Sequence, residues 1–258
     1  MTHVRRGWNL AALQILELRS MSQDIQVDRF FESLVNGNRD SARATVTAAL
    51  TRCDSARTVI NDLLWPSHEM IEKLHRSDQI DQMAYHLSTR LLRVMVDQVA
   101  ARLEIPANRT RTIFAVCGPS QSEELGAQMA VDLLESSGFH VTFSGGGVPG
   151  DEIIAQVQDR QPDVLLMFAS AASDLPDIRM VIDRLKEVGA CESTRIVVGG
   201  GVFNRAEGLA EEIGADLSAS SPMDLVELLT QETLRPAMGA RQTTARSTAT
   251  ATRRRKAA

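Results

Sequence analysis

After Pro106 the sequence alternates between short β-branched runs and longer amphipathic segments, and this alternation constrains the fold more than any other feature. The run VLLMF, Val164–Phe168, is apolar throughout, which is typical of a strand covered on both faces. Helix-length connections between such strands require the strands to be parallel. The predicted strands are Thr112–Val116, His140–Phe143, Val164–Phe168, Arg195–Val198 and Ala215–Ser218. The predicted helices are Glu123–Ser136, Gly150–Arg160, Pro176–Val188, Arg205–Ile213 and Pro222–Glu232.

This pattern predicts an α/β domain with a flavodoxin-like five-stranded parallel sheet and helices on both faces. Before Pro106, from about Ile25 to Leu103, apolar residues recur at helical spacing in four segments with short connections. That pattern predicts an N-terminal four-helix-bundle cap. The chain then divides into an N-terminal extension (1–23), the helical cap (24–105), the flavodoxin-like domain (106–235) and a tail (236–258).

The composition indicates the cellular compartment and argues against several classes of function. The three cysteines, Cys53, Cys117 and Cys191, lie far apart, which argues against a disulfide scaffold or zinc site and favours a reducing cytoplasm. No run is long and apolar enough to span a membrane, and the N-terminus lacks a signal-peptide core. The net charge is −5, although the tail is basic and should be disordered. Any nucleic-acid contact should be weak and confined to that tail.

The segment RTIFAVCGPSQSEELG, residues 111–126, passes from a strand through a small-polar loop into a helix. Loops at the carboxyl edge of a parallel sheet are where α/β proteins bind ligands. Two further loops of small residues, after the third and fourth strands, should meet it there. The candidate ligand-binding residues in these loops are Ser120, Gln121, Ser122, Glu123, Gly126, Ser170, Gly199, Gly200 and Gly201. Ser120-x-x-Glu123 is equally a capping box, a structural device at a helix start.

These segments, in this order, resemble cobalamin (vitamin B12)-binding proteins, which pair a helical cap with a flavodoxin-like domain. FFESLVNGNRDSARATVTAAL resembles the first two cap helices, and RIVVGGGVFNRAEGLAEEIGADLSAS resembles the family's Gly-Gly loop and Gly-Ala-Asp strand. The resemblance implies a cobalamin cofactor whose nucleotide tail enters the slot between the first, third and fourth loops.

One motif departs from the family. Its first loop carries D-x-H-x-x-G, with the His on cobalt, whereas alignment on Gly126 places Glu123 at the His position and Gln121 at the Asp position. A carboxylate is a poor substitute for imidazole on cobalt. We therefore expect cobalamin to bind with its own benzimidazole coordinated (base-on), and a methyl-carrier role is disfavoured.

Histidines of the cap could supply a metal ligand instead. Leu74 and His75 resemble the cap's Trp-His segment in light-sensing cobalamin regulators, with Leu74 in place of Trp. His86 resembles the cap's Glu-His pair, with Tyr85 in place of Glu. His75 and His86 are therefore candidate cobalt ligands, although a lone helical His is more often structural. His68 is expected on a helix surface.

No nucleophile elbow, P-loop or metal-ligand spacing is present, so we expect a protein that is not an enzyme. The favoured function is a cobalamin-binding sensor or regulatory protein, in which the ligand shifts the arrangement of the domains and a protein partner responds. The alternatives are a corrinoid methyl carrier of a methyltransferase system and a degenerate interaction module without cobalamin. A homo-oligomer is compatible with each.

Overall fold

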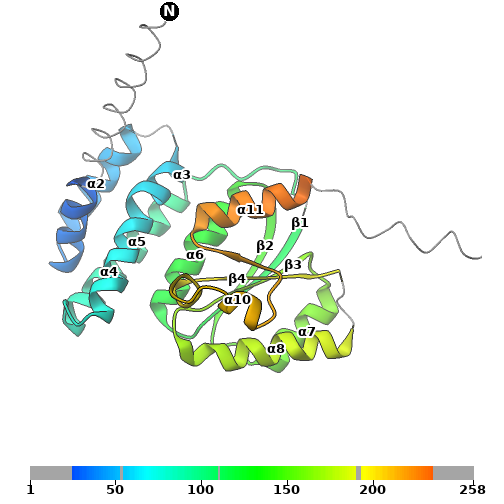
Figure 1. The fold of residues 1–258 in the computed structure, drawn as a ribbon. Coiled ribbons are helices and arrows are strands. Elements are labelled where there is room, and N and C mark those ends of the chain that lie inside the picture. The colour runs from blue at the N-terminus through cyan, green and yellow to red at the C-terminus, as the bar shows by residue number, and fades with distance from the viewer. Residues whose placement is uncertain (1–24, 53–54, 110, 190–192, 235–258) are drawn as a thin grey trace, which may run out of the picture.

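The structure is a computed structural model that describes residues 25–52, 55–109, 111–189 and 193–234. The expected N-terminal extension and basic tail lie outside these residues. A helical cap packs beside an α/β domain (Figure 1). Within the described residues, no helix is both long enough and apolar enough to traverse a lipid bilayer.

The cap is a set of helices that precede the sheet. It comprises a helix over residues 25–35, α2 (Arg39–Arg52), α3 (Ala56–Val59), the π-helical turn η1 (Ile60–Leu64), α4 (Trp65–Arg76) and α5 (Gln82–Ala100). Ser55 caps α3 and Asp81 caps α5 through side-chain oxygens that accept a backbone N–H. The π turn ends at Leu64, two residues before Pro66, whose ring has no N–H and clashes with the carbonyl four residues earlier in a regular α-helix.

The α/β domain contains one five-stranded parallel sheet in the order β2-β1-β3-β4-β5, which is the flavodoxin-like order. Its strands are β1 (Arg111–Cys117), β2 (Phe139–Gly146), β3 (Val164–Phe168), β4 (Arg195–Gly199) and β5 (Leu217–Ala219). The helices and the 3-10 turn are α6 (Gln121–Ser136), α7 (Gly150–Arg160), η2 (Ala172–Asp174), α8 (Leu175–Val188), α9 (Gly201–Arg205), α10 (Leu209–Glu212) and α11 (Pro222–Leu234). The predicted flavodoxin-like parallel sheet preceded by a helical cap is confirmed.

Two elements differ most from the expected ones. The expected single helix Arg205–Ile213 is wrong, because α9 ends at Arg205 and α10 begins only at Leu209. Gly208, at φ +78°, caps α10 in a left-handed conformation that interrupts a continuous helix. β2 runs on to Gly146, three residues beyond its predicted end, with a register irregularity opposite β1 between Ala115 and Cys117.

Alternate side chains of the central strands enter two different cores. Phe114 and Leu165 face the core beneath α7 and α8. Ile113 and Leu166 face the core beneath α6 and α11, and this second core continues without interruption into the cap. Arg57 of α3 adds a polar contact across the same boundary, since its guanidinium donates to Ser137 Oγ at 2.7 Å. The cap and one face of the sheet are therefore packed as one unit.

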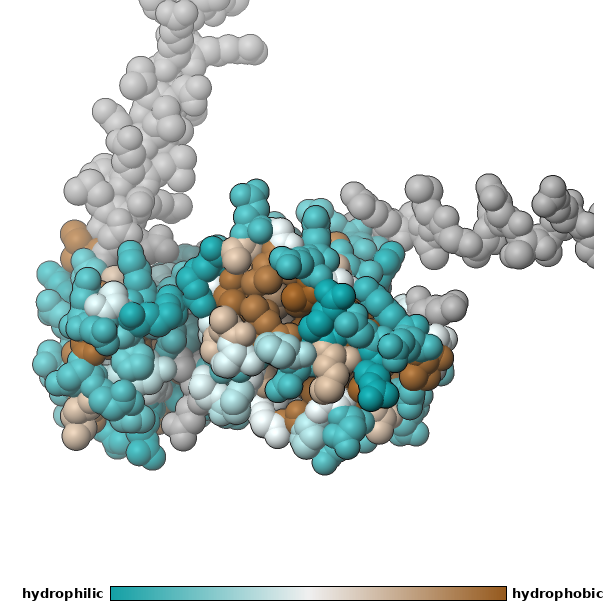
Figure 2. Space-filling model, turned by 60° about the horizontal axis from the view of Figure 1, so that its bottom comes forward, coloured by the Kyte–Doolittle hydropathy of each residue, from teal (hydrophilic) through white to brown (hydrophobic). Residues whose placement is uncertain are grey.

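The outer surface is mixed. On the face in Figure 2 most residues are hydrophilic, and hydrophobic residues gather in a patch on the α/β domain beside the cap.

Candidate functional site

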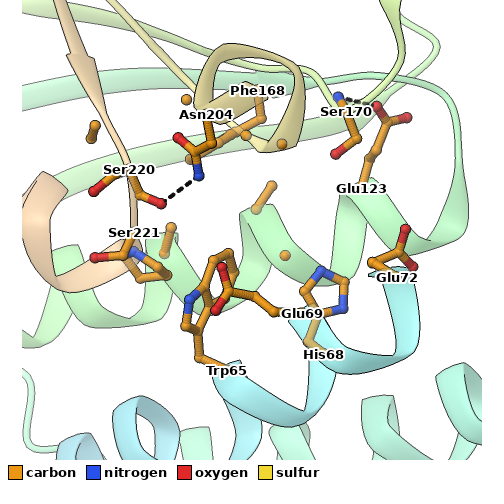
Figure 3. A pocket seen from close by; sticks show the side chains of 18 of the residues that line it. Trp65, His68, Glu69, Glu72, Glu123, Phe168, Ser170, Asn204, Ser220 and Ser221 are labelled. Carbon is orange, nitrogen blue, oxygen red and sulfur yellow. Dashed lines mark hydrogen bonds between the residues drawn. The ribbon is translucent and has the colours of Figure 1, made fainter. Parts of the chain in front are cut away.

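A pocket lies between α4 of the cap and the carboxyl edge of the sheet (Figure 3). It contains about 880 Å³ of empty space, including the part open to solvent. The residues on its sheet side come from α6 and from the segments after β3, β4 and β5: Glu123, Gly126, Ala127, Ala130, Phe168, Ser170, Gly199, Gly200, Gly201, Asn204, Arg205, Ala219, Ser220, Ser221, Pro222 and Leu225. The structure thus brings together Glu123 and Gly126, Ser170, and Gly199–Gly201 from the three expected loops, and adds the segment after β5.

Small side chains form most of the sheet-side wall. Gly126, Ala127 and Ala130 present backbone and methyl groups along one face of α6. Gly200 has a φ of +106°, and a Cβ there would collide with the carbonyl oxygen of Ala169. That loop can therefore close against β3 only with glycine at this position.

Glu123 is buried and anchors the loop after β1. It forms the expected capping box, because Ser120 Oγ accepts from the Glu123 N–H while Oε2 of Glu123 accepts from the Ser120 backbone N–H at 3.3 Å. The Ser120 hydroxyl also donates to Oε2, at 2.8 Å. Its other oxygen, Oε1, accepts from the Ser170 N–H at 2.6 Å, a bond visible in Figure 3. A Cβ on Gly118 would lie 2.5 Å from Oε2, so the carboxylate occupies space that only glycine leaves free. Glu123 therefore ties the loops after β1 and β3 together.

A second carboxyl group adjoins Glu123. Burial first, and then the nearby Glu123 carboxylate, raise the pKa of Asp174. Because two negative charges at this distance repel each other, the Asp174 and Glu123 carboxyl groups are not both readily ionised.

The cap contributes one face of α4 to the pocket. Its lining residues are Trp65, His68, Glu69, Glu72 and Arg76. Their spacing of three, one, three and four residues places them along one side of the helix. His68 is 7% exposed, and burial lowers its imidazole pKa, an effect that Glu72 opposes. The neutral imidazole is therefore favoured. The expectation that His68 lies on a helix surface is wrong, because this side of α4 is covered by α6.

Charged and polar groups close the ends of the pocket. Arg205 donates from Nη2 to the Ser170 carbonyl at 2.5 Å. Burial and nearby Arg76 lower the pKa of Arg205, whereas Glu72 raises it. Asn204 donates from Nδ2 to the Ser220 carbonyl at 2.8 Å, which links the segments after β4 and β5 (Figure 3). These bonds fix the loops around the space between them.

Some expected site residues lie elsewhere. Leu74, His75 and His86 do not line this pocket. His75 stacks on Tyr85 with ring centroids 3.7 Å apart, and its Nε2 lies 3.3 Å from Gln82 Oε1. The Gln82 amide in turn lies 2.8 Å from His86 Nε2. Both imidazoles thus have partners within the cap and lie outside this pocket, and their role as cobalt ligands stays a prediction.

The loop residues beside Glu123 contribute differently. Ser120 acts as the α6 cap and does not line the pocket. Gln121 and Ser122 have side chains outside the described part of the structure.

Sequence reasoning did not single out the α4 face or Arg205. The sequence does place four residues on one side of this helix by their spacing: Trp65, His68, Glu72 and Arg76. The same spacing is equally compatible with a helix side that faces solvent. Only the packing of α4 against α6 distinguishes the two. Among the described residues, His, Cys, Asp and Glu side chains form no group of three or more that could hold a metal ion.

Two family models described as "B12 binding domain" match the chain, one over residues 111–226 and the other over 26–99. The dimethylamine corrinoid protein 1 of Methanosarcina acetivorans is 30% identical over 103 residues, which are 40% of this chain and 47% of that protein. The trimethylamine corrinoid protein of Methanosarcina barkeri is 26% identical over 40% of this chain and 46% of that protein. These alignments span about half the length of each relative.

The fold has a solved counterpart. The monomethylamine corrinoid protein of Methanosarcina barkeri matches 81% of this chain and 99% of its own, with a TM-score of 0.71 and 17% identity. The likeness includes the helical cap as well as the sheet. Since the matched domains cover both parts of the structure and meet at the pocket, the chain belongs to the B12-binding domain proteins, whose cofactor is cobalamin.

Proposed function

We propose that the chain is a corrinoid protein that holds cobalamin between its cap and its sheet and serves a methyltransferase partner as methyl carrier. The observation that carries the proposal is the pocket between α4 and the carboxyl edge of the sheet. Support comes from the similarity to corrinoid proteins named for methylamines, which favours the carrier alternative over a sensor. In this proposal the chain is not itself an enzyme, because the partner would supply the catalytic groups.

The residues of the pocket fit the nucleotide tail of a corrinoid. A flat, narrow group needs walls without bulky side chains, and Gly126, Ala127 and Ala130 on α6 face Gly199–Gly201 across the space. Backbone groups and the Ser220 and Ser221 side chains offer hydrogen bonds to it. Bound cobalamin would supply a cobalt centre that can carry a methyl group. The chain's own part would be to hold the tail, orient the corrin and exclude water.

Glu123 favours a second candidate function. Its carboxylate is held by Ser120 and by the Ser170 N–H, and it occupies the position of the family's cobalt-ligating His. Cobalamin would then keep its own benzimidazole, as expected from the sequence, and could act as a signal rather than a carrier. A regulatory role with a protein partner remains the alternative proposal.

Binding is tested by titrating the purified full chain with aquocobalamin and following visible absorption. We expect saturable binding by the wild type. Ser170→Phe should weaken binding roughly tenfold or more, because the new ring would point into the pocket while both backbone bonds of residue 170 stay in place. The matched control is Ser173→Phe, at an exposed position of the same loop. Equal affinities of the two variants would remove this pocket from the proposal.

Carrier and regulator are separated by a second measurement. Chain loaded with radiolabelled methylcobalamin is mixed with extract of the source cells and a thiol acceptor. Transfer that depends on the chain supports the carrier. No transfer, together with a ligand-dependent change in the radius of gyration by small-angle scattering, supports the regulator.

A further inference from the structure

His68 is the histidine that the structure places at the pocket. It lies on α4, one turn after Trp65, with the two ring centroids 5.5 Å apart. Its Nε2 lies 3.0 Å from the point where a Cβ on Gly126 would stand. In Figure 3 the ring projects from the cap toward the space between α4 and α6. The glycine of the family's loop motif thus leaves room for a cap imidazole.

One ring nitrogen of His68, Nδ1, is buried and has no hydrogen-bond partner among the described residues. An unpaired buried polar atom is costly, so such atoms are rare in native interiors.

The neighbouring buried polar residues of the cap behave differently. Ser67, the preceding residue, donates to the Leu63 carbonyl at 2.7 Å. Ser33, Ser88 and Thr89 each donate to a backbone carbonyl of their own helix. An imidazole is therefore the exception in a cap whose other buried polar side chains are satisfied, and it faces the pocket.

The other cap histidines are poorer candidates for the same role. His75 is stacked on Tyr85, and both His75 and His86 contact Gln82. Recruiting either of them would break these contacts, whereas recruiting His68 would satisfy an unpaired group. Imidazole is also a good ligand for cobalt, which a carboxylate such as Glu123 is not.

We propose that His68 is the protein ligand to the cobalt of a bound corrinoid, approaching it from the cap side of the pocket. The inference rests on the proposed function, because it requires cobalamin in this pocket, and a methyl group carried on the same face of the corrin would displace the imidazole. A ring nitrogen donates its lone pair to cobalt and a water molecule leaves, with no oxidation or reduction. Glu123 then keeps its structural role, and the cap supplies the nitrogen that the loop lacks.

The test uses the full chain loaded with aquocobalamin. A cobalt-bound water loses a proton as the pH rises from about 7 to 10, and the visible spectrum shifts, whereas a bound imidazole shows no such change. We expect the wild-type complex to keep one spectrum over this range. His68→Ala and the bulkier His68→Gln should both restore the pH-dependent shift, while His75→Ala and His86→Ala should behave as wild type.

The outcomes separate the two proposals. If the wild type binds and its spectrum shifts with pH as in His68→Ala, the ligand role of His68 is overturned and cobalamin binding stands. If the shift appears in His75→Ala or His86→Ala but not in the His68 variants, the ligand is another histidine. If the wild type binds no corrinoid, the proposed function itself fails. Far-ultraviolet circular dichroism identifies a variant that does not fold, and the other His68 variant then decides.

Discussion

Oε1 of Glu123 accepts a hydrogen bond of 2.6 Å from the backbone N–H of Ser170, which joins the loop after β1 to the loop after β3. The two residues are 47 positions apart in the chain, so this bond fixes tertiary geometry at the sheet edge. A buried carboxylate with several donors is costly to remove, because the donors lose their partner as well.

The first prediction concerns this carboxylate. Glu123→Ala should lower the free energy of unfolding by about 2–3 kcal/mol, since it removes a capping-box partner and a charged acceptor. Urea unfolding at neutral pH measures the loss. The control is Glu124→Ala, which removes only a partly exposed contact with Arg93 at 3.7 Å and should cost under about 1 kcal/mol. Equal losses would mean that Glu123 acts as an ordinary surface residue.

The second prediction concerns the contact between Gly126 and His68. Replacing a glycine within a helix by alanine usually stabilises it by about 1 kcal/mol. Here the new Cβ would lie 3.0 Å from His68 Nε2, so Gly126→Ala should show little gain or a loss. In a His68→Ala background the full gain should return. A double-mutant cycle of unfolding free energies measures the coupling, and identical effects in both backgrounds would show that the imidazole does not press on α6.

The third prediction is a pH dependence at the interface of α5 and α6. Burial, with repulsion from Glu135 and Asp97, raises the pKa of Asp132 to about 6, although a hydrogen bond from Gln128 opposes the shift. The folded state therefore holds this proton to a higher pH than the unfolded state, and ionisation lowers stability as the pH rises from about 4 to 6. Asp132→Asn should leave the free energy of unfolding nearly unchanged at about pH 4 and raise it by about 1–3 kcal/mol at about pH 8.

Thermal unfolding at both pH values checks this, with Asp159→Asn on the exposed surface of α7 as control. A gain for Asp132→Asn of the same size at both pH values would contradict the titration of Asp132.

The fourth prediction concerns Cys117. Burial first, then the charges of Glu124 and Glu123, raise the pKa of its thiol to about 12, while Arg93 lowers it. Only the thiolate reacts with iodoacetamide, so in a Cys53→Ser, Cys191→Ser background the folded chain should react at least about 100-fold more slowly than the unfolded chain near pH 8.5. Mass spectrometry follows the alkylation. Similar rates in the folded and unfolded chains would show an accessible thiolate.

The fifth prediction concerns Gly200, where a substitution should lower stability by itself, so that a loss of ligand binding in such a variant would not show that Gly200 contacts the ligand. Because a Cβ at this position collides with the Ala169 carbonyl and φ is +106°, Gly200→Val should destabilise the fold whether or not cobalamin binds. Gly189→Val is also strained, at φ +60°, but it meets open space and should cost less. The difference in thermal midpoint without ligand checks this. Equal midpoints would mean that the loop relaxes around the new side chain.

Local signals predicted much of the fold. The continuous apolar run Val164–Phe168 and the amphipathic segment Gly150–Arg160 coincide with β3 and α7, because local period and length settle such elements. The sequence did not predict the break between α9 and α10. A glycine such as Gly208 can lie inside a helix or interrupt it at a positive φ, and the helical pattern does not distinguish the two.

The sequence predicted the part of the site that depends on sheet topology and missed the part that depends on packing between distant segments. The topology of a parallel sheet places the loops after β1, β3 and β4 at one edge, so the sequence alone groups Glu123, Ser170 and Gly200. The side of α4 that faces the sheet is decided by packing between distant segments. His68 therefore could not be distinguished from His75 by helical spacing alone.

The continuous core beneath the cap bears on how fast a cofactor can enter and leave. Lifting the cap away from α6 would expose apolar side chains to water and break the contact between Arg57 and Ser137. If cobalamin enters by that opening, the cost of exposing the core keeps the open state rare at equilibrium. Loading of this protein should therefore be slow, and cobalamin once captured should exchange over much longer times than diffusion would allow.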